Sequence, residues 1–132
     1  MTQHLPSTQE SPGLRQSTPP SPVWAVLGST GFIGARVCAG LKAAGITVRT
    51  VPAPRLKSSA GDAAGILAEA ADLAGVRSEL AAAFTGADVV INAAGLATPG
   101  GTDSPELRGA NSLLPMLIAD AADDAGLRRF VH

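Results

Sequence analysis

The sequence predicts an α/β fold with a parallel, doubly wound sheet, and three observations carry this prediction. Short apolar runs that are typical of buried strands alternate with segments whose apolar residues recur at helical spacing. A glycine-rich loop directly follows the first of these runs. The alternation of strands and helices implies right-handed crossovers and therefore a parallel sheet. The chain of 132 residues, 45% of them apolar, is long enough for one such domain.

Charge and cysteine content exclude several classes of partner and location. The net charge of -1 gives no attraction to nucleic acid or to an anionic membrane, so we expect small-molecule partners. The single cysteine, Cys38, cannot form an internal disulfide and fits a reducing compartment. No run reaches the roughly 18 apolar residues of a membrane span, and the N-terminus lacks the features of a signal peptide. We therefore expect a soluble, cytoplasmic protein.

The N-terminal segment differs in composition from the rest of the chain. Residues 1–22 are rich in Ser, Thr, Gln and Pro and have almost no apolar periodicity. Such a segment cannot bury enough surface to offset the cost of ordering it. We predict a disordered tail over 1–22 and one folded domain over 23–132.

The first half of this domain predicts strand, helix and strand. An apolar run over 23–27 ends on glycine, as a strand buried on both faces should. A helix begins near Phe32 and ends before Gly45, and a β-branched strand over 46–51 follows. The next segment is rich in Ala and Gly, which permit a helix, but the apolar pair at 66–67 indicates a weak third strand that ends near Asp72.

The second half continues the alternation. A helical stripe over 76–84 precedes a buried strand over 87–93. A long helix is expected over 104–126, and Pro115 is expected to bend it. The last residues, 129–132, begin a fifth strand.

The glycine-rich loop between the first strand and the first helix is spaced G-x-x-G-x-x-G. Phosphates can approach a backbone only where side chains are missing, and the N–H groups and positive dipole end of the next helix then bind the anion. We expect Gly28 to make the tight turn, Gly31 to admit the pyrophosphate and Gly34 to let helix and strand pack closely. The context favours the dinucleotide site of a Rossmann fold over an ordinary strand-to-helix turn. The predicted cofactor-binding residues of the loop are Gly28, Ser29, Thr30, Gly31, Phe32, Ile33 and Gly34.

The choice between NAD and NADP depends on the residues after the second strand. A site for NAD usually has an acidic residue there, about 20 residues after the glycine loop. This chain has no acid in that place and instead offers Arg49, Arg55 and Lys57. A cation there can pair with the 2′-phosphate of NADP. We therefore favour NADP, with Arg55 as its ligand; the alternative is that these cations are solvated surface residues.

Five motifs follow one another along residues 23–132. They are VLGSTGFIG at 26–34, ADL at 71–73, GADVVINAAG at 86–95, Asn111, and RRFVH at 128–132. With these motifs in this order, the chain resembles the N-terminal part of the extended short-chain dehydrogenase/reductase family, specifically the NAD-dependent epimerase/dehydratases.

The resemblance implies further cofactor contacts. In the family, residues that match Asp72 and Leu73 contact the adenine, and a helix asparagine that matches Asn111 supports the active site and the preceding strand. The Asp72–Leu73 pair and the stretch at 93–95 are both expected at the carboxyl ends of strands, where open α/β sheets bind ligands. The alternatives are that Asp72 caps a helix and that Asn111 is an exposed helix residue, and we expect Asn92 to satisfy local backbone groups. The family's cofactor-lining stretch corresponds here to Ala93, Ala94 and Gly95.

The chain departs from the family pattern in its catalytic residues. The family's Ser or Thr lies a few residues beyond the strand that His132 interrupts, and its Tyr-x-x-x-Lys pair lies further still. This chain contains no tyrosine, so the general acid/base of the family is absent. His132 resembles an ordinary strand residue, and we assign no catalytic residue and no metal ligand.

Three interpretations of function follow. The first is the NAD(P)-binding N-terminal part of an epimerase, dehydratase or related reductase that acts on a nucleotide-sugar or similar small molecule, inactive as this chain. The second is a non-catalytic NAD(P)-binding regulator or redox sensor, and the third is a disrupted gene product without function. The family's subunit-pairing helices overlap the region where this chain ends, so the resemblance allows a homodimer without predicting one.

Overall fold

The computed structural model describes residue 13 and residues 18–97 and 101–132. Most of the predicted tail, 1–22, lies outside the described residues. The described part contains four strands: β1 Val23–Leu27, β2 Thr47–Val51, β3 Val89–Asn92 and β4 Arg129–Val131. All neighbouring pairs are parallel, in the order β2-β1-β3-β4. This sheet confirms the predicted doubly wound α/β fold.

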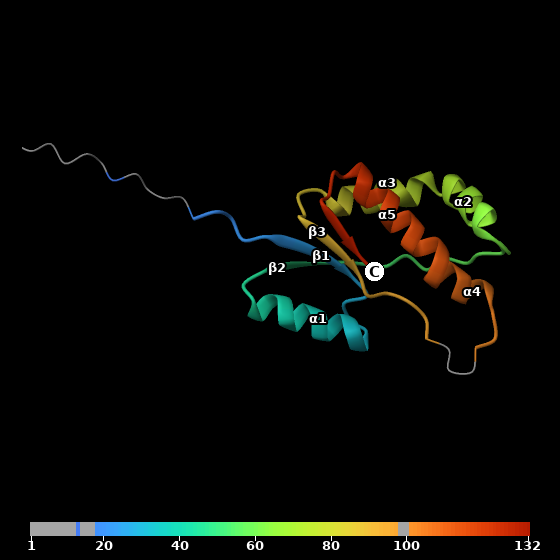
Figure 1. The fold of residues 1–132 in the computed structure, drawn as a ribbon, viewed down its shortest axis with the longest axis horizontal. Helices are drawn as coiled ribbons and strands as arrows, with labels where there is room; N and C mark the ends of the chain where they lie inside the picture. Colours follow the sequence, from blue (N-terminus) through green and yellow to red (C-terminus); the bar gives the residue numbers. More distant parts are fainter. Residues whose placement is uncertain (1–12, 14–17, 98–100) are drawn as a thin grey trace, which may run out of the picture.

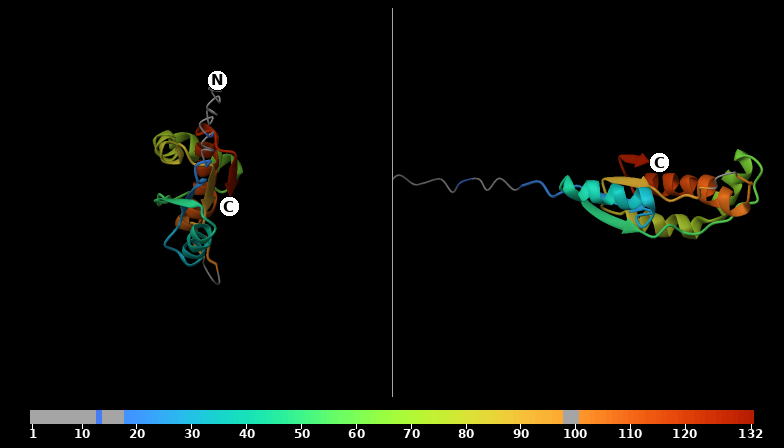
Figure 2. Two further views of the ribbon diagram at one scale, coloured as in Figure 1. Left: turned by 90° about the vertical axis from the view of Figure 1, so that its left-hand side faces the viewer. Right: turned by 90° about the horizontal axis from the view of Figure 1, so that it is seen from below.

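Helices cover both faces of the sheet. Figure 1 shows α1 on one face, with α3 and α5 on the other, and the end-on view in Figure 2 shows the same layering. The helical segments are α1 Phe32–Ala43, α2 Ala63–Asp72, α3 Ala74–Phe84, α4 Pro105–Arg108, the π-helical η1 Gly109–Leu113, and α5 Leu114–Asp124.

The prediction of a third strand at 66–67 is wrong, because that segment belongs to α2. Asp62 caps this helix by accepting a hydrogen bond from the Gly65 N–H at 2.8 Å, and alanines fill half of its ten positions. The apolar pair at 66–67 is therefore one turn of a helix. The strand predicted as the fifth is β4, since one predicted strand is absent from the described sheet.

The long helix predicted over 104–126 is present as three consecutive segments, α4, η1 and α5. Ser104 caps its start, with its side chain accepting from the Leu107 N–H at 3.1 Å. The π-helical turn ends two residues before Pro115, whose ring has no N–H and would press on the carbonyl group four residues earlier, within that turn. Widening of the helix at this point relieves that conflict.

The main hydrophobic core lies between the sheet and the α3–α5 layer. It includes Leu27, Phe84 and Leu117, all fully buried. On the opposite face α1 buries only Gly34 and Cys38. Because Leu27 is in register with both Val51 and Asn92, the carboxyl ends of β1, β2 and β3 meet at one edge of the sheet.

Candidate functional site

The glycine-rich loop leaves the carboxyl end of β1 and turns directly into α1. Gly28 has φ of +74°, a conformation that disfavours any residue with a Cβ, and its carbonyl oxygen accepts from the Gly31 N–H at 3.1 Å. Gly31 is the N-cap of α1. The tight turn predicted at Gly28 is therefore present.

Close packing explains two of the three glycines. A Cβ on Gly34 would overlap the carbonyl oxygen of Gly28, so no side chain fits where helix and strand meet. A Cβ on Gly28 would lie 2.5 Å from the carbonyl carbon of Ala93 and from the amide nitrogen of Ala94. The loop after β1 thus touches the backbone of the loop after β3.

Gly31 is different, because a Cβ there would meet only the Gly28 oxygen, at an ordinary 3.4 Å. The residue is exposed, no side chain caps α1 there, and the first turn of α1 contains no acid. Phe32 is 86% exposed and Ile33 67% exposed, so the start of the helix is open. Free N–H groups at a helix N-terminus with open space before them suit a phosphate anion.

The stretch Ala93, Ala94 and Gly95 directly follows β3, and the backbone of Ala93 and Ala94 packs against the glycine-rich loop. The Ala93 N–H donates to the Leu27 carbonyl oxygen at 2.9 Å and continues the β1–β3 ladder by one residue. The buried Asn92 then accepts from the Ala94 N–H at 3.0 Å through its Oδ1 atom. The expectation that Asn92 satisfies local backbone groups is confirmed.

Asn111 of η1 binds the segment that follows β3. Its Oδ1 atom accepts from the Leu96 N–H at 3.0 Å, and its Nδ2 atom donates to the Leu96 carbonyl oxygen at 2.9 Å. A Cβ on Gly95 would lie 3.1 Å from the same Oδ1 atom. Asn111 therefore supports the segment after β3, although the residue itself is exposed.

The three predicted cations have different surroundings. Arg49 of β2 donates through Nη1 to the carbonyl oxygens of Ala83, at 3.1 Å, and Thr85, at 2.7 Å, so it caps the end of α3. Lys57 pairs with Glu106 at 3.3 Å. Arg55 is exposed, and no described residue forms a hydrogen bond or an ion pair with its side chain.

Asp72 and Leu73 follow a helix rather than a strand. Asp72 is the exposed last residue of α2, and Leu73 joins α2 to α3. Neither residue is placed at a strand end, so the reasoning from strand ends does not apply to them. The alternative that Asp72 caps the helix after it is also wrong, because Leu73 occupies that N-cap position without a side-chain bond.

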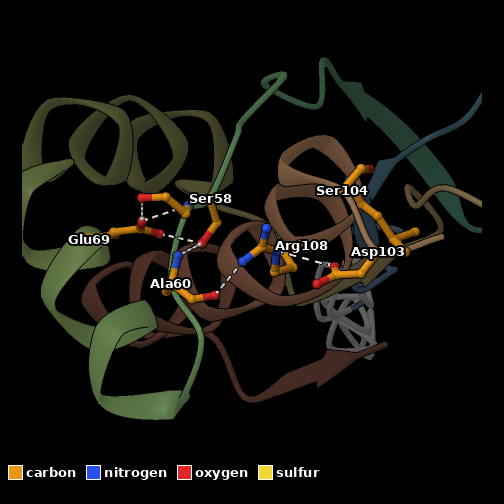
Figure 3. Close-up of polar contacts among 8 residues, drawn as sticks. Ser58, Ala60, Glu69, Asp103, Ser104 and Arg108 are labelled. Carbon is orange, nitrogen blue, oxygen red and sulfur yellow. Dashed lines mark hydrogen bonds and ion pairs between the residues drawn. The ribbon is translucent and has the colours of Figure 1, made fainter.

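A polar network that the sequence did not reveal fixes the segment between β2 and α2. The buried Ser58 donates to Glu69 at 2.5 Å, and its Oγ atom accepts from the Ala60 N–H at 3.1 Å. The hydrogen bond from Ser58 lowers the pKa of the Glu69 carboxyl group, and hydrogen bonds from Ser59 lower it further. Figure 3 shows the network continuing to Arg108, which donates to the Ala60 carbonyl oxygen at 2.9 Å. The segment that carries Arg55 is thus tied to both α2 and α4.

Two hollows lie near this segment. One, of about 280 Å³, adjoins the carboxyl end of β2 and is lined mainly by apolar side chains of residues 51–54 and of α3. The other, of about 540 Å³, lies between α2 and the α4–η1 turn and includes Arg108 in its lining. The first is the closer to the sheet edge where the strands end, because Val51 is the last residue of β2.

His132 has a partner that the sequence analysis did not foresee. Its Nδ1 atom lies 3.1 Å from the Nδ2 atom of Asn92, 40 residues earlier, and its ring stacks on Phe130. His132 thus lies at the same sheet edge as the glycine-rich loop, next to the end of β3.

Among the residues that the structure describes, no cluster of His, Cys, Asp and Glu could hold a metal ion. In the same described part, no helix is both long enough and apolar enough to cross a membrane.

A comparison with models of protein families shows which family the chain belongs to. The chain matches the model of the NAD dependent epimerase/dehydratase family over residues 24–132. The chain belongs to this family. The match confirms the resemblance predicted from the five motifs. A comparison with curated proteins gave no match.

Solved structures with a similar fold include proteins with bound NAD. MoeE5 in complex with UDP-glucose and NAD is 24% identical, with a TM-score of 0.58 over 81% of this chain and 34% of that one. A short-chain dehydrogenase/reductase superfamily protein from Agrobacterium tumefaciens with bound NAD is 25% identical, with a TM-score of 0.55 over 82% of this chain and 31% of that one.

Uronate dehydrogenase from the same organism is 17% identical, with a TM-score of 0.54 over 83% of this chain and 39% of that one. The chain therefore spans 31 to 39% of the length of these three structures. Since two of them are less than 25% identical to it, they support the fold of the epimerase/dehydratase family alone.

Proposed function

We propose that residues 23–132 bind NAD(P) at the carboxyl edge of the sheet, as the N-terminal part of an oxidoreductase that acts on a nucleotide-sugar or a similar small molecule. The observation that carries the proposal is the open N-terminus of α1 at Gly31, beside the tight backbone contact of Gly28 with Ala93 and Ala94. Only glycine fits at 28 and 34, whereas the space at 31 is free for a ligand.

The residues present fit the dinucleotide. The N–H groups at the start of α1 would bind the pyrophosphate, and Ala93, Ala94 and Gly95 would line the path of the cofactor. The apolar hollow at residues 51–54 suits a flat ring such as adenine, and Asp72 and Leu73 stay proposed contacts on the resemblance alone. A bound nicotinamide ring supplies hydride transfer, while the protein supplies orientation.

The same reasoning extends to the other cofactor-binding residues. Ser29, Thr30, Phe32 and Ile33 lie in the loop or at the open start of α1, so their backbone groups are available to the phosphates. Asn111 would act indirectly, by holding the loop at Leu96. MoeE5 and the short-chain dehydrogenase/reductase superfamily protein from Agrobacterium tumefaciens were solved with NAD, which supports a nicotinamide cofactor for this family member.

The proposal is tested by titrating the protein with NADH and NADPH while following nicotinamide fluorescence. Gly31→Asp places a carboxylate at the phosphate position and should abolish binding. Gly31→Ala should leave the fold intact and weaken binding by about tenfold or more, equivalent to 1.4 kcal/mol. Gly40→Ala is the matched control, since it lies on α1 and its Cβ would meet nothing within 4 Å. Equal affinity for all three variants would contradict the site.

We further propose that Arg55 binds the 2′-phosphate and gives a preference for NADPH. Arg49 and Lys57 already have partners, whereas the exposed Arg55 has none among the described residues. Arg55→Ala should weaken NADPH binding by about tenfold and leave NADH binding unchanged, because a charge-assisted hydrogen bond is lost. Lys42→Ala, at the far end of α1, is the control. An equal loss for both cofactors would contradict this assignment.

We expect no turnover from this chain, since it contains no tyrosine to act as general acid/base. The measurement is NAD(P)H formation or loss with UDP-sugars and uronic acids as substrates. Cofactor binding without turnover agrees with this proposal and also with the non-catalytic sensor. Turnover would overturn the expectation of an inactive chain and exclude the sensor.

A further inference from the structure

The amide of Asn92 has one allowed orientation. Its Oδ1 atom accepts from the Ala94 N–H, which can only donate, so the atom facing Ala94 is the oxygen. The other amide atom, 3.1 Å from the His132 Nδ1 atom, is then the nitrogen. An amide nitrogen only donates, so the His132 Nδ1 atom accepts and carries no proton. The neutral imidazole therefore holds its proton on Nε2.

We propose that His132, in this neutral form, positions the cofactor-facing turn after β3, and that protonation of His132 releases the turn. The imidazole holds Asn92, Asn92 holds the Ala94 N–H, and the backbone of Ala93 and Ala94 packs on Gly28. His132 thus acts on the glycine-rich loop through Asn92 and is a positioning residue. The part of this inference that concerns cofactor affinity rests on the proposed function.

Protonation breaks the link for a simple reason. An imidazolium ion carries an N–H on both nitrogens and cannot accept a hydrogen bond. The donor on Asn92 would then face another donor, so either the amide turns and abandons Ala94 or the ring moves away. The first movement removes the acceptor of the Ala94 N–H, and the second removes the contact that fixes the Asn92 amide, so both weaken the support of the backbone beside Gly28. Histidine side chains change charge between about pH 5 and 8, so mild acid is the condition that tests this.

The groups around His132 are mostly neutral. β3 presents Asn92 and contains no charged residue, and Phe130 stacks on the ring at 6.3 Å between centroids. Two exposed cations precede Phe130: Arg128, just before β4, and Arg129, the first residue of β4.

The acids of α5, the helix packed on β4, belong to its last two turns. Since α5 runs back along the sheet, these turns adjoin the start of β4 and not its end. Two of them, Asp120 and Asp124, contact Arg77. Asp123 is the third, and it is exposed.

The first experiment reads the tautomer directly, by long-range ¹H–¹⁵N spectra of the imidazole rings in the protein at pH 8. The chain contains two histidines, His4 and His132, and His4→Asn and His132→Asn assign their signals. We expect His132 to show an unprotonated Nδ1 and a protonated Nε2. An Nδ1-protonated ring, or an average of both tautomers, would overturn the inference whether or not the protein binds a cofactor.

The second experiment measures NADH affinity at pH 8 and pH 5.5. NADH is the probe because the 2′-phosphate of NADPH itself titrates near pH 6. The wild-type dissociation constant should rise about fivefold in acid, as expected for one lost hydrogen bond. His132→Ala should bind weakly at both pH values, whereas His132→Asn offers a non-titrating acceptor and should restore affinity at both.

The outcomes separate this inference from the proposed function. A wild-type affinity that is equal at both pH values, or a His132→Asn variant as pH-sensitive as the wild type, would overturn the positioning role. Absence of binding by both NADH and NADPH at pH 8 would overturn the proposed function as well as the effect on affinity. The tautomer measurement would then still decide whether His132 accepts from Asn92.

Discussion

Arg77 of α3 and Asp124 of α5 form an ion pair with two hydrogen bonds. The Nε and Nη2 atoms of Arg77 donate to the two carboxylate oxygens of Asp124, at 2.6 and 2.7 Å. This geometry is the strongest form of a charge-assisted pair. It raises the pKa of Arg77 and lowers the pKa of Asp124, and Asp120 adds a weaker contact at 3.6 Å. The pair joins the two helices that cover the core face of the sheet.

Replacement of Arg77 by Met should lower the melting temperature by about 2–4 °C at pH 7, because the pair is partly exposed and screened by solvent. Since the folded-state pKa of Asp124 is lowered, its contribution is present above the unfolded pKa of about 3.9 and is lost as the pH falls through the folded pKa. The difference between wild type and variant should therefore shrink as the pH falls below about 3.9.

Thermal melting followed by the fluorescence of Trp24, the only tryptophan, checks this prediction. The control is Arg36→Met, which removes an exposed arginine from α1. A difference between wild type and Arg77→Met that is as large at pH 2 as at pH 7 would mean that the packing of the Arg77 stem, and not its charge, stabilises the fold.

Replacement of Gly34 by Ala should disrupt the domain. The new methyl group would overlap the Gly28 carbonyl oxygen, and the backbone of β1 cannot move without disturbing its pairing with β2 and β3. We expect the melting temperature to fall by about 10 °C or more. Gly40→Ala on the same helix should instead raise it by about 2–6 °C, because alanine is the better helix former. Similar values for the two variants would show that the close approach at Gly34 is unimportant.

Local patterns were enough to predict the parts of the site that lie close together in the sequence. The glycine-rich loop is specified by a strand, three glycines and a helix within 12 residues, so its conformation follows from neighbouring residues. The β3 strand and the residues after it form an apolar run that only Asn92 interrupts. Their contact with Gly28 follows from the general rule that parallel strands end at one edge.

Other features depend on residues that are far apart in the chain, and the sequence pattern did not reveal them. Whether the segment at 66–67 becomes strand or helix depends on the cap at Asp62 and on packing against η1. The partner of Arg49 is the end of α3, 34 residues away, and the partner of His132 is 40 residues away. A buried serine such as Ser58 gives no periodic signal, because its burial is explained only by Glu69.

The bond between Ser58 and Glu69 predicts a clear difference between two neighbouring serines. Ser58→Ala removes a buried hydroxyl that donates to Glu69 and accepts from the Ala60 N–H, and it leaves that N–H without its partner. We expect the melting temperature to fall by about 4–8 °C. Ser59→Ala, which removes an exposed hydroxyl 3.2 Å from the same carboxylate, should cost less than half as much. Equal losses would contradict the importance of burial.

The two bonds from Asn111 to Leu96 predict a graded series of variants. Asn111→Ala loses both bonds, so the loop that follows β3 should open more often and NADH should bind about five to ten times more weakly. Asn111→Asp keeps an acceptor for the Leu96 N–H but places a carboxylate beside the Leu96 carbonyl oxygen, so its affinity should be intermediate. Ser112→Ala, the exposed neighbour on η1, is the control.

Hydrogen exchange at the Leu96 amide tests the same series without a cofactor. Exchange should be fastest in Asn111→Ala, intermediate in Asn111→Asp and unchanged in Ser112→Ala, since protection depends on how often the N–H loses its acceptor. Faster exchange with unchanged NADH affinity would show that Asn111 holds the loop without shaping the cofactor site. Unchanged exchange in Asn111→Ala would show that the loop is held by other contacts, such as the packing of Gly28 on Ala93 and Ala94.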